Sequence, residues 1–224
     1  MPLDLRKAYR EFYSATRQPE IITVPPVHYA VVRGFGDPNR RNKFLKQAIT
    51  ILYIVGRTLK MSYRTEHQIR DFVPYVMPPL EGFWRQTGEG GLDLTSKDRL
   101  HWMMASRLPE FVTREDFDWA VRYASAKREM DCAYARFQTI EEGLCVQCLH
   151  IGPYAEENGT AGRMEEFLSA NGYALDLTEQ RQHHEIYLSD ARKIPAERLR
   201  TLLRQPIRPC VREERSQEAF YEDA

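Results

Sequence analysis

A carboxylate stands among imidazole and aromatic side chains in the segment HHEIYLSD, residues 183–190. Its alternation of residue types predicts a strand in which Glu185 and Tyr187 share one face, opposite a largely apolar face. A carboxylate walled by rings would lose part of its hydration. Such a group can act as a general base on water or as the counter-ion of a cationic ligand. A solvated strand carboxylate is the plainer alternative.

Tyr154 is a second candidate for chemistry. It follows Gly152-Pro153 at a predicted strand-to-helix turn. Its hydroxyl could donate a hydrogen bond to an oxyanion that develops during a reaction. An ordinary hydrogen bond that caps the turn explains the same residue equally well, so both interpretations stay open.

The remaining candidates are large apolar side chains that could contact a ligand. Trp102 and Met104 share one face of a predicted strand, and Trp102 with Trp84 and Phe83 would form a box in which a planar ring stacks. The faces of such rings also attract cations. Each ring alone is explained as well by core packing. Weaker candidates, on or beside predicted helices, are Tyr53, Phe111 and Trp119.

Composition argues against several classes of partner. The 32 Lys and Arg residues balance 32 Asp and Glu residues, so no basic surplus exists to neutralise a phosphate backbone, and we expect no direct nucleic-acid binding. The longest apolar stretch, 48–55, is too short to span a bilayer, and the charged N-terminus does not resemble a signal peptide. We therefore expect a cytoplasmic protein without membrane contact and with reduced thiols.

Cysteine and histidine spacing does not predict a metal site. Cys145 and Cys148 lie three residues apart in a predicted strand and so face opposite sides, as do the adjacent His183 and His184. No P-loop, dinucleotide fingerprint or Gly-x-Ser-x-Gly motif occurs. We expect no cofactor, and the sequence carries no signal for an oligomeric state.

The elements that must position these residues follow in two rounds. The first round is predicted to contain strands at 21–24, 27–33 and 72–76, and a further strand segment that runs up to Trp84. It is also predicted to contain a long helix at 44–59, a glycine loop at 88–91, a strand at 100–106 and a helix that begins at Thr113. A polar connection covers 126–142. The second round is predicted to contain a strand at 144–151, a helix at 157–170, a strand at 184–189 and a short helix that opens at Pro195, with Leu199, Leu202 and Leu203 on one side.

The two rounds predict an α+β protein. In each round, an apolar strand ends at a Gly, a Gly or Pro follows, and an acidic residue then leads into a helix. We expect two β-α-β-β repeats, at about 21–125 and 135–210, with a lead-in at 1–20 and a charged tail at 211–224. The junction of two such halves is a natural place for a ligand cleft.

Four segments resemble the GyrI-like proteins, which carry a small-molecule-binding domain. They are PPLEGFW at 78–84, HWMM at 101–104, LHIGPY at 149–154 and HHEIYLSD at 183–190, with the turn GDPN at 36–39 in support. The resemblance covers about 21–209. It implies a duplicated β-α-β-β fold of the SHS2 type with an aromatic-walled central cleft. The sequence departs from the family pattern at Arg85, where a second aromatic residue often follows Trp84, and at Ala191, where Pro is usual.

The resemblance also implies a function. Related drug-sensing domains hold a buried acidic residue against planar cationic drugs, and a standalone branch hydrolyses the cyclopropane ring of DNA-alkylating natural products. The chain has no fused helix-turn-helix region and so resembles that branch. We expect binding of planar aromatic, often cationic molecules and detoxification by ring opening, with Glu185 activating water and Tyr154 bonding the dienone oxygen. The alternatives are a module that sequesters drugs without chemistry, or a gyrase-interacting protein.

Overall fold

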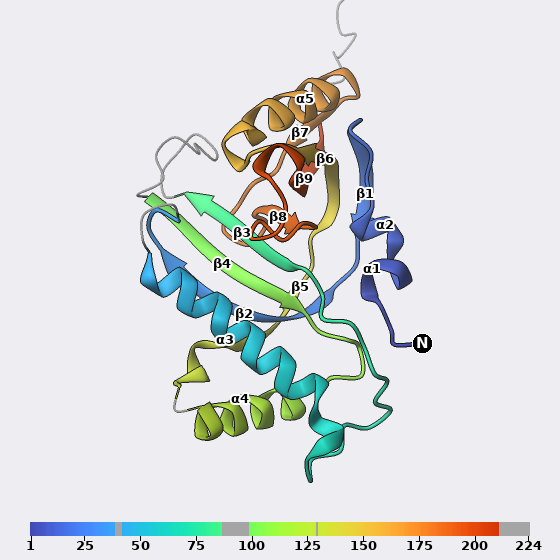
Figure 1. The fold of residues 1–224 in the computed structure, drawn as a ribbon. Coiled ribbons are helices and arrows are strands. Elements are labelled where there is room, and N and C mark those ends of the chain that lie inside the picture. The colour runs from blue at the N-terminus through green and yellow to red at the C-terminus, as the bar shows by residue number, and fades with distance from the viewer. Residues whose placement is uncertain (39–41, 87–98, 129, 211–224) are drawn as a thin grey trace, which may run out of the picture.

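The computed structural model describes residues 1–38, 42–86, 99–128 and 130–210 (Figure 1). Within these ranges the chain has an α+β fold built on a nine-stranded, antiparallel sheet. The predicted α+β class is thus confirmed. The predicted glycine loop at 88–91 and the charged tail at 211–224 lie outside the described residues.

The strands are β1 (Glu20–Val24), β2 (Val27–Phe35), β3 (Leu80–Gln86), β4 (Leu100–Arg107), β5 (Arg136–Ile140), β6 (Gly143–Ile151), β7 (Tyr173–Leu175), β8 (His183–Tyr187) and β9 (Arg200–Pro209). The α-helices are α1 (Leu5–Ala8), α2 (Arg10–Tyr13), α3 (Lys43–Lys60), α4 (Arg114–Arg128) and α5 (Glu157–Ala170). Short 3-10 turns are η1 (Ser62–Arg64), η3 (Cys132–Tyr134), η4 (Tyr154–Glu156) and η5 (Ala196–Arg198).

Helix α3 forms where the sequence predicts it. The side chain of Asn42 accepts a hydrogen bond from the backbone N–H of Leu45 and so caps the first turn. Ala48, Leu52 and Val55 recur at intervals of three or four residues and are fully buried. This stripe fixes which face of the helix packs against the sheet.

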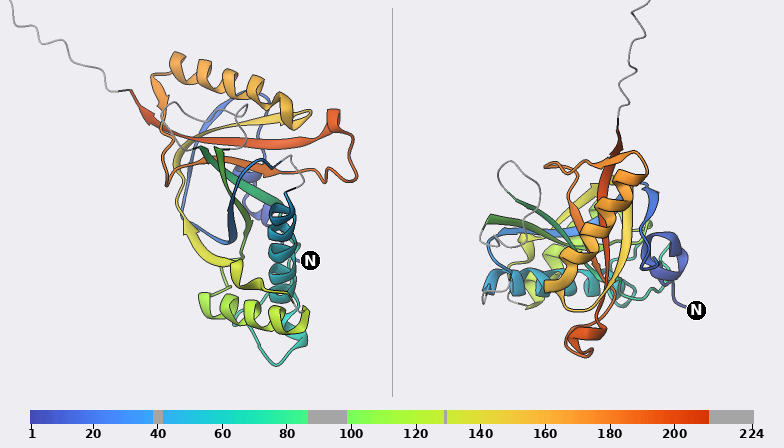
Figure 2. Two further views of the ribbon diagram at one scale, coloured as in Figure 1. Left: turned by 90° about the vertical axis from the view of Figure 1, so that its left-hand side faces the viewer. Right: turned by 90° about the horizontal axis from the view of Figure 1, so that it is seen from above.

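The register of the sheet shows that α3 and α5 cover the same face. Residues paired directly across antiparallel strands point to the same side, and one such row crosses six strands through Val32, Met104, Gly82, Glu185, Leu203 and Cys148. Helix α3 packs at the Val32 and Met104 end of this row, and α5 packs at the Leu203 and Cys148 end. We call this side the helix face; the left view of Figure 2 shows α5 at one end of the molecule and α3 in the opposite half. Glu185 therefore lies midway between them.

Strands β1–β2 and β5–β6 form one long antiparallel ribbon. Val24 pairs with Gly143 and Val27 pairs with Ile140, so a single register continues across the junction at Pro25-Pro26. Strands β1 and β6 lie at one end of the strand order and β2 and β5 at the other. The ribbon therefore joins the two edges and closes the sheet on itself, which leaves fewer free edges. The face opposite the helices is then the inside of the closed sheet.

Three predicted elements are wrong. Residues 136–140 form the edge strand β5 rather than a connection, because a strand at an edge tolerates polar side chains. Residues 200–209 form β9, not a helix; this strand is buried on both faces, so its leucines do not alternate with polar residues. Residues 72–76 form no strand, and Tyr75 makes only an isolated bridge to Leu3.

Charged side chains meet inside the closed sheet in what we call the inner ionic network. His184 bonds Glu142 through Nδ1 and Glu81 through Nε2, both at 2.9 Å, and Arg204 donates to Glu142 at 2.8 Å. Tyr13 of α2 donates to Glu81 at 2.9 Å, and every member is buried. Burial alone would lower the pKa of His184, but the two carboxylates raise it above its ordinary value. An imidazolium with both N–H groups bonded fits this geometry.

The inner ionic network predicts a pH dependence of stability. Burial opposes ionisation of Glu142, but His184 and Arg204 lower the pKa of Glu142 from 4.5 to about 2. The carboxylate therefore stabilises the fold above pH 4.5, and this contribution is lost as the pH falls toward about 2. We expect Glu142→Gln to lower the free energy of unfolding by about 3–5 kcal/mol near neutral pH and to flatten its decline in acid.

Urea unfolding across this pH range measures both effects. The neighbouring Glu141 is exposed, and Glu141→Gln serves as the matched control. Equal stability of the two variants would show that the network does not support the fold.

Candidate functional site

Glu185 lies on the helix face of β8 within a row of three polar side chains. Its side chain is buried, with 6% of the residue exposed. Oε2 accepts a hydrogen bond of 2.6 Å from the hydroxyl of Tyr187, and Oε1 lies 3.5 Å from Nε2 of His183. The alternation of a strand brings these three residues to one face, as the sequence predicts for Glu185 and Tyr187. Burial and the Glu185 carboxylate raise the pKa of Tyr187 well above its ordinary value, so its hydroxyl remains a donor.

Gly82 of β3 lets two further polar atoms approach this row. It is the cross-strand partner of Glu185, and Trp84 is that of His183. A Cβ atom at Gly82 would lie 2.9 Å from both Nε1 of Trp84 and the hydroxyl of Tyr187. These two groups therefore converge over the bare backbone. We call His183, Glu185, Tyr187 and Trp84 the Glu185 cluster.

Several buried polar atoms on this face lack a hydrogen-bond partner among the described residues. They are both ring nitrogens of His183, the indole nitrogens of Trp84 and Trp102, the hydroxyl of Thr201 and the side-chain oxygen of Gln205. Leaving a buried polar group unsatisfied costs about 1–3 kcal/mol. A bound molecule or ordered water that supplies the missing partners would recover this free energy. The arrangement is typical of a binding surface rather than of a finished core.

Tyr154 reaches the same place from the turn that follows β6. Gly152 adopts φ of 141°, which glycine tolerates, and the chain then turns through Pro153 into η4. The ring of Tyr154 packs edge-on against Tyr187 at 5.7 Å. Burial raises the pKa of Tyr154, and so do the carboxylates of Glu157 and Glu185. Its hydroxyl, on a residue that is 42% exposed, therefore stays protonated near neutral pH. The two predicted catalytic residues thus lie near one another.

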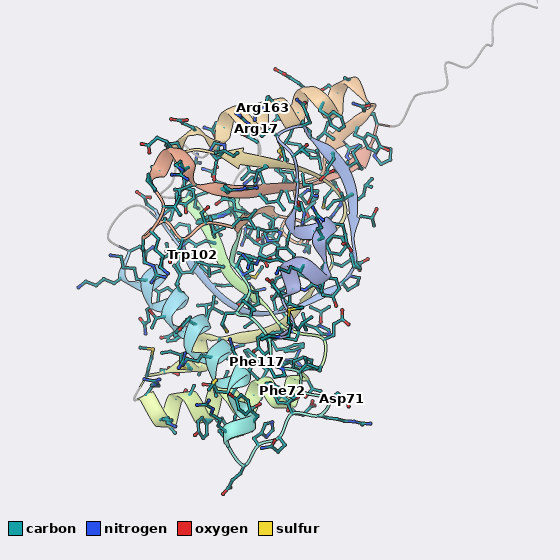
Figure 3. The ribbon with its side chains drawn as sticks, turned by 45° about the vertical axis from the view of Figure 1, so that its right-hand side comes forward. Arg17, Asp71, Phe72, Trp102, Phe117 and Arg163 are labelled. Carbon is teal, nitrogen blue, oxygen red and sulfur yellow. The ribbon has the colours of Figure 1, made fainter. Side chains whose placement is uncertain are left out.

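The predicted aromatic box is only partly assembled. Trp84 and Trp102 are cross-strand partners on the helix face, with Met104 beside them. Trp102 is buried next to Phe44 of α3, so its ring is held in the core (Figure 3). Phe83 points to the inside of the sheet and stacks on His184 at 3.9 Å. The three-ring box is therefore wrong, because adjacent strand residues face opposite sides.

Two of the three weaker aromatic candidates, Phe111 and Trp119, lie apart from the Glu185 cluster. Trp119 of α4 stacks on His67, and Phe111 packs against Phe72 and Tyr75. Figure 3 places Phe72 toward the α4 end of the molecule, away from Trp102. Tyr53 is 55% exposed on α3. The structure therefore does not bring Phe111 or Trp119 to Glu185.

Two residues of the site were missed in the sequence. His183 lies two positions before Glu185, so the same alternation could have placed it beside the carboxylate. Glu157, buried at the start of α5, acts electrostatically on Tyr154 and Tyr187; no local pattern marks it. Within the described ranges no group of His, Cys, Asp or Glu side chains could hold a metal ion. Over those ranges, too, every helix is too short or too polar to cross a membrane.

The family model of the GyrI-like small molecule binding domain matches residues 17–208. The chain therefore belongs to the GyrI-like family. No curated protein matches it.

Solved structures from Listeria innocua are similar over almost the whole chain. An uncharacterized conserved protein is 38% identical with a TM-score of 0.86, covering 92% of this chain and 100% of its own. A protein described as a hydrolase is 36% identical with a TM-score of 0.82 and the same coverage. A second described hydrolase is 37% identical with a TM-score of 0.83, covering 93% of this chain and 100% of its own.

Gly82→Ala tests whether the close approach over β3 organises the cluster. The added methyl group would collide with Trp84 and Tyr187, and we expect a loss of about 1–3 kcal/mol in the free energy of unfolding together with a shift in tryptophan fluorescence. Gly162 of α5 has open space around it, so Gly162→Ala is the control. If the two variants behave alike, Gly82 does not hold the cluster in place.

Proposed function

We propose that this protein binds a planar aromatic small molecule on the helix face and opens it by hydrolysis, with Glu185 as the central group. The observation that carries the proposal is the Glu185 carboxylate itself. It is buried, Tyr187 occupies one oxygen, and the other oxygen has no hydrogen-bond donor bound to it among the described residues. On the same face lie polar atoms that have no hydrogen-bond partner among the described residues.

The binding place we propose is a cleft between two β-α-β-β repeats. The strand order β6-β9-β8 is followed by β3-β4-β2, so the corresponding strands of the two rounds occur in mirrored order. Each round contributes one helix to the same face, α3 or α5. The halves meet where β8 pairs with β3, and Glu185 faces Gly82 at that junction. A ligand there would lie between the helices and contact both halves.

The proposed binding uses stacking and charge. Trp84 and Tyr187 offer ring surface and polar atoms next to the carboxylate, and a flat ring system could pack against them. Glu185 would attract a cationic ligand, and such a charge pair gains strength where water is excluded. Tyr53, exposed on α3, would contact the ligand at the rim.

The proposed reaction is water attack on a cyclopropane ring fused to a dienone. The water oxygen bonds to the ring methylene while the strained carbon–carbon bond breaks. Its electron pair moves to the dienone oxygen, which becomes a phenolate. Glu185 accepts the proton of the water, and Tyr154 donates a hydrogen bond to the developing phenolate. After proton exchange with solvent, one water has been added and the product no longer alkylates DNA, which would make the activity a detoxification.

Two observations support hydrolysis in particular. Two structures that are 36% and 37% identical over the whole of their own length are described as hydrolases. The pairing of an acidic acceptor with a protonated tyrosine also suits a reaction in which one proton is taken and one negative charge develops. The choice of a cyclopropane substrate rests on the resemblance of the HIGPY and HHEIYLSD segments to the hydrolase branch of the family.

Mass spectrometry of a duocarmycin-type cyclopropane compound tests the proposal. We expect the wild type to form the water adduct over many turnovers. Glu185→Gln keeps the shape and a hydrogen-bond acceptor for Tyr187 but removes the base, so kcat should fall about 10²–10⁴-fold. Tyr154→Phe should lower kcat about 10-fold or more through the lost hydrogen bond.

Glu197 is exposed in η5, and Glu197→Gln is the matched control, expected to keep full activity. Intact compound that is bound by the wild type but never converted would exclude hydrolysis of this class and leave a module that sequesters its ligand.

A further inference from the structure

His183 is the member of the Glu185 cluster that the proposed reaction does not use. It is 2% exposed, and neither ring nitrogen has a hydrogen-bond partner among the described residues. Trp84 is its partner across the sheet. An imidazole placed in this way carries two unmet hydrogen-bonding groups into a buried site, which is costly unless another molecule meets them.

The distance between His183 and Glu185 is informative. Charge-assisted N–H···O bonds to a carboxylate measure about 2.7–2.9 Å, whereas Nε2 of His183 and Oε1 of Glu185 are 3.5 Å apart. The two side chains are therefore neighbours without a direct hydrogen bond. Two atoms at this separation can both be reached by a third atom at about 2.8 Å from each.

Both atoms are suited to accept a hydrogen bond. Oε1 of an ionised carboxylate is an acceptor, and the other oxygen of Glu185 is already engaged by Tyr187. A neutral imidazole has one unprotonated nitrogen, and with the proton on Nδ1 the acceptor is Nε2, which faces Glu185. Two acceptors side by side match the two O–H groups of one water molecule.

We propose that His183 and Glu185 together hold one water molecule on the helix face of β8, and that this water is the nucleophile of the proposed hydrolysis. The inference rests on the proposed function. Water that donates one O–H to each side chain turns its lone pairs away from both, toward a ligand on the same face.

This arrangement gives His183 a distinct part in the reaction. As the water oxygen bonds to the ring methylene and the carbon–carbon bond breaks, the proton on the Glu185 side moves to Oε1. The second proton stays on the oxygen and keeps its hydrogen bond to Nε2, so His183 ends the step unchanged. His183 would thus orient the nucleophile and Glu185 would accept its proton. Orientation of this kind acts on kcat rather than on ligand binding.

His183→Phe removes both nitrogens and keeps a ring of similar size. We expect kcat on the cyclopropane compound to fall at least about 10-fold while KM stays within about 3-fold. His183→Gln, which returns a side-chain oxygen acceptor, should recover part of the loss. His101 lies on the opposite face of β4, beside Phe35, so His101→Phe is the matched control and should keep full kcat. Unchanged kcat in His183→Phe would overturn the proposal, as would an equal loss in the control.

A high-resolution crystal structure of the ligand-free wild type tests the water site without any turnover. We expect a solvent peak within about 3.2 Å of both Nε2 of His183 and Oε1 of Glu185, and its absence from the structure of His183→Phe. No peak in the wild type would overturn the water site even if the protein is a hydrolase. A clear peak in a protein that converts no cyclopropane compound would keep the water site and reject the hydrolysis.

Discussion

The rest of the structure depends on the charge balance inside the closed sheet. Glu81 and Glu142 face His184 and Arg204, and all four are buried. Removing four charges from water is unfavourable, and only close pairing offsets it. The members come from β3, the β5–β6 junction, β8 and β9, so the pairing is satisfied in one arrangement of these strands. Because His184 is fixed inward, the next residue, Glu185, must face the helices.

The two faces of β8 therefore have opposite characters. On the inner face, each charge of the inner ionic network has a partner of opposite charge, and these bonds fix the position of β8. On the helix face, His183 and its neighbours carry polar atoms that have no hydrogen-bond partner in the part of the chain that the structure describes. A saturated network is rigid, and an unsaturated one beside it can receive a ligand without moving the strand. His184 of the inner ionic network and the carboxylate-bearing Glu185 are adjacent on β8 and yet face opposite sides of the sheet, which follows from strand alternation alone.

Sequence reasoning succeeded where local periodicity was enough. The α+β class, helix α3 and the shared face of Glu185 and Tyr187 followed from the period of the side chains. It failed at β9, because a strand buried on both faces shows no alternation of polar and apolar residues. It also failed at Phe83, which was placed in one aromatic box with the adjacent Trp84 although adjacent strand residues face opposite sides. The inner ionic network was out of reach, because its pairs are 42 to 103 residues apart in the chain and leave no local trace.

The ribbon that closes the sheet also makes the N-terminal and C-terminal parts of the chain depend on each other for strand pairing. Strand β1 precedes β2 in the chain but pairs with β6, and β5 precedes β6 but pairs with β2. The strands β1 and β5 therefore each pair with a strand from the other part of the chain. Such contacts join residues far apart in the sequence, which slows folding. A chain cut between α4 and β5 would therefore leave β1 without β6 in one piece and β5 without β2 in the other, so that each piece would carry a strand without its partner.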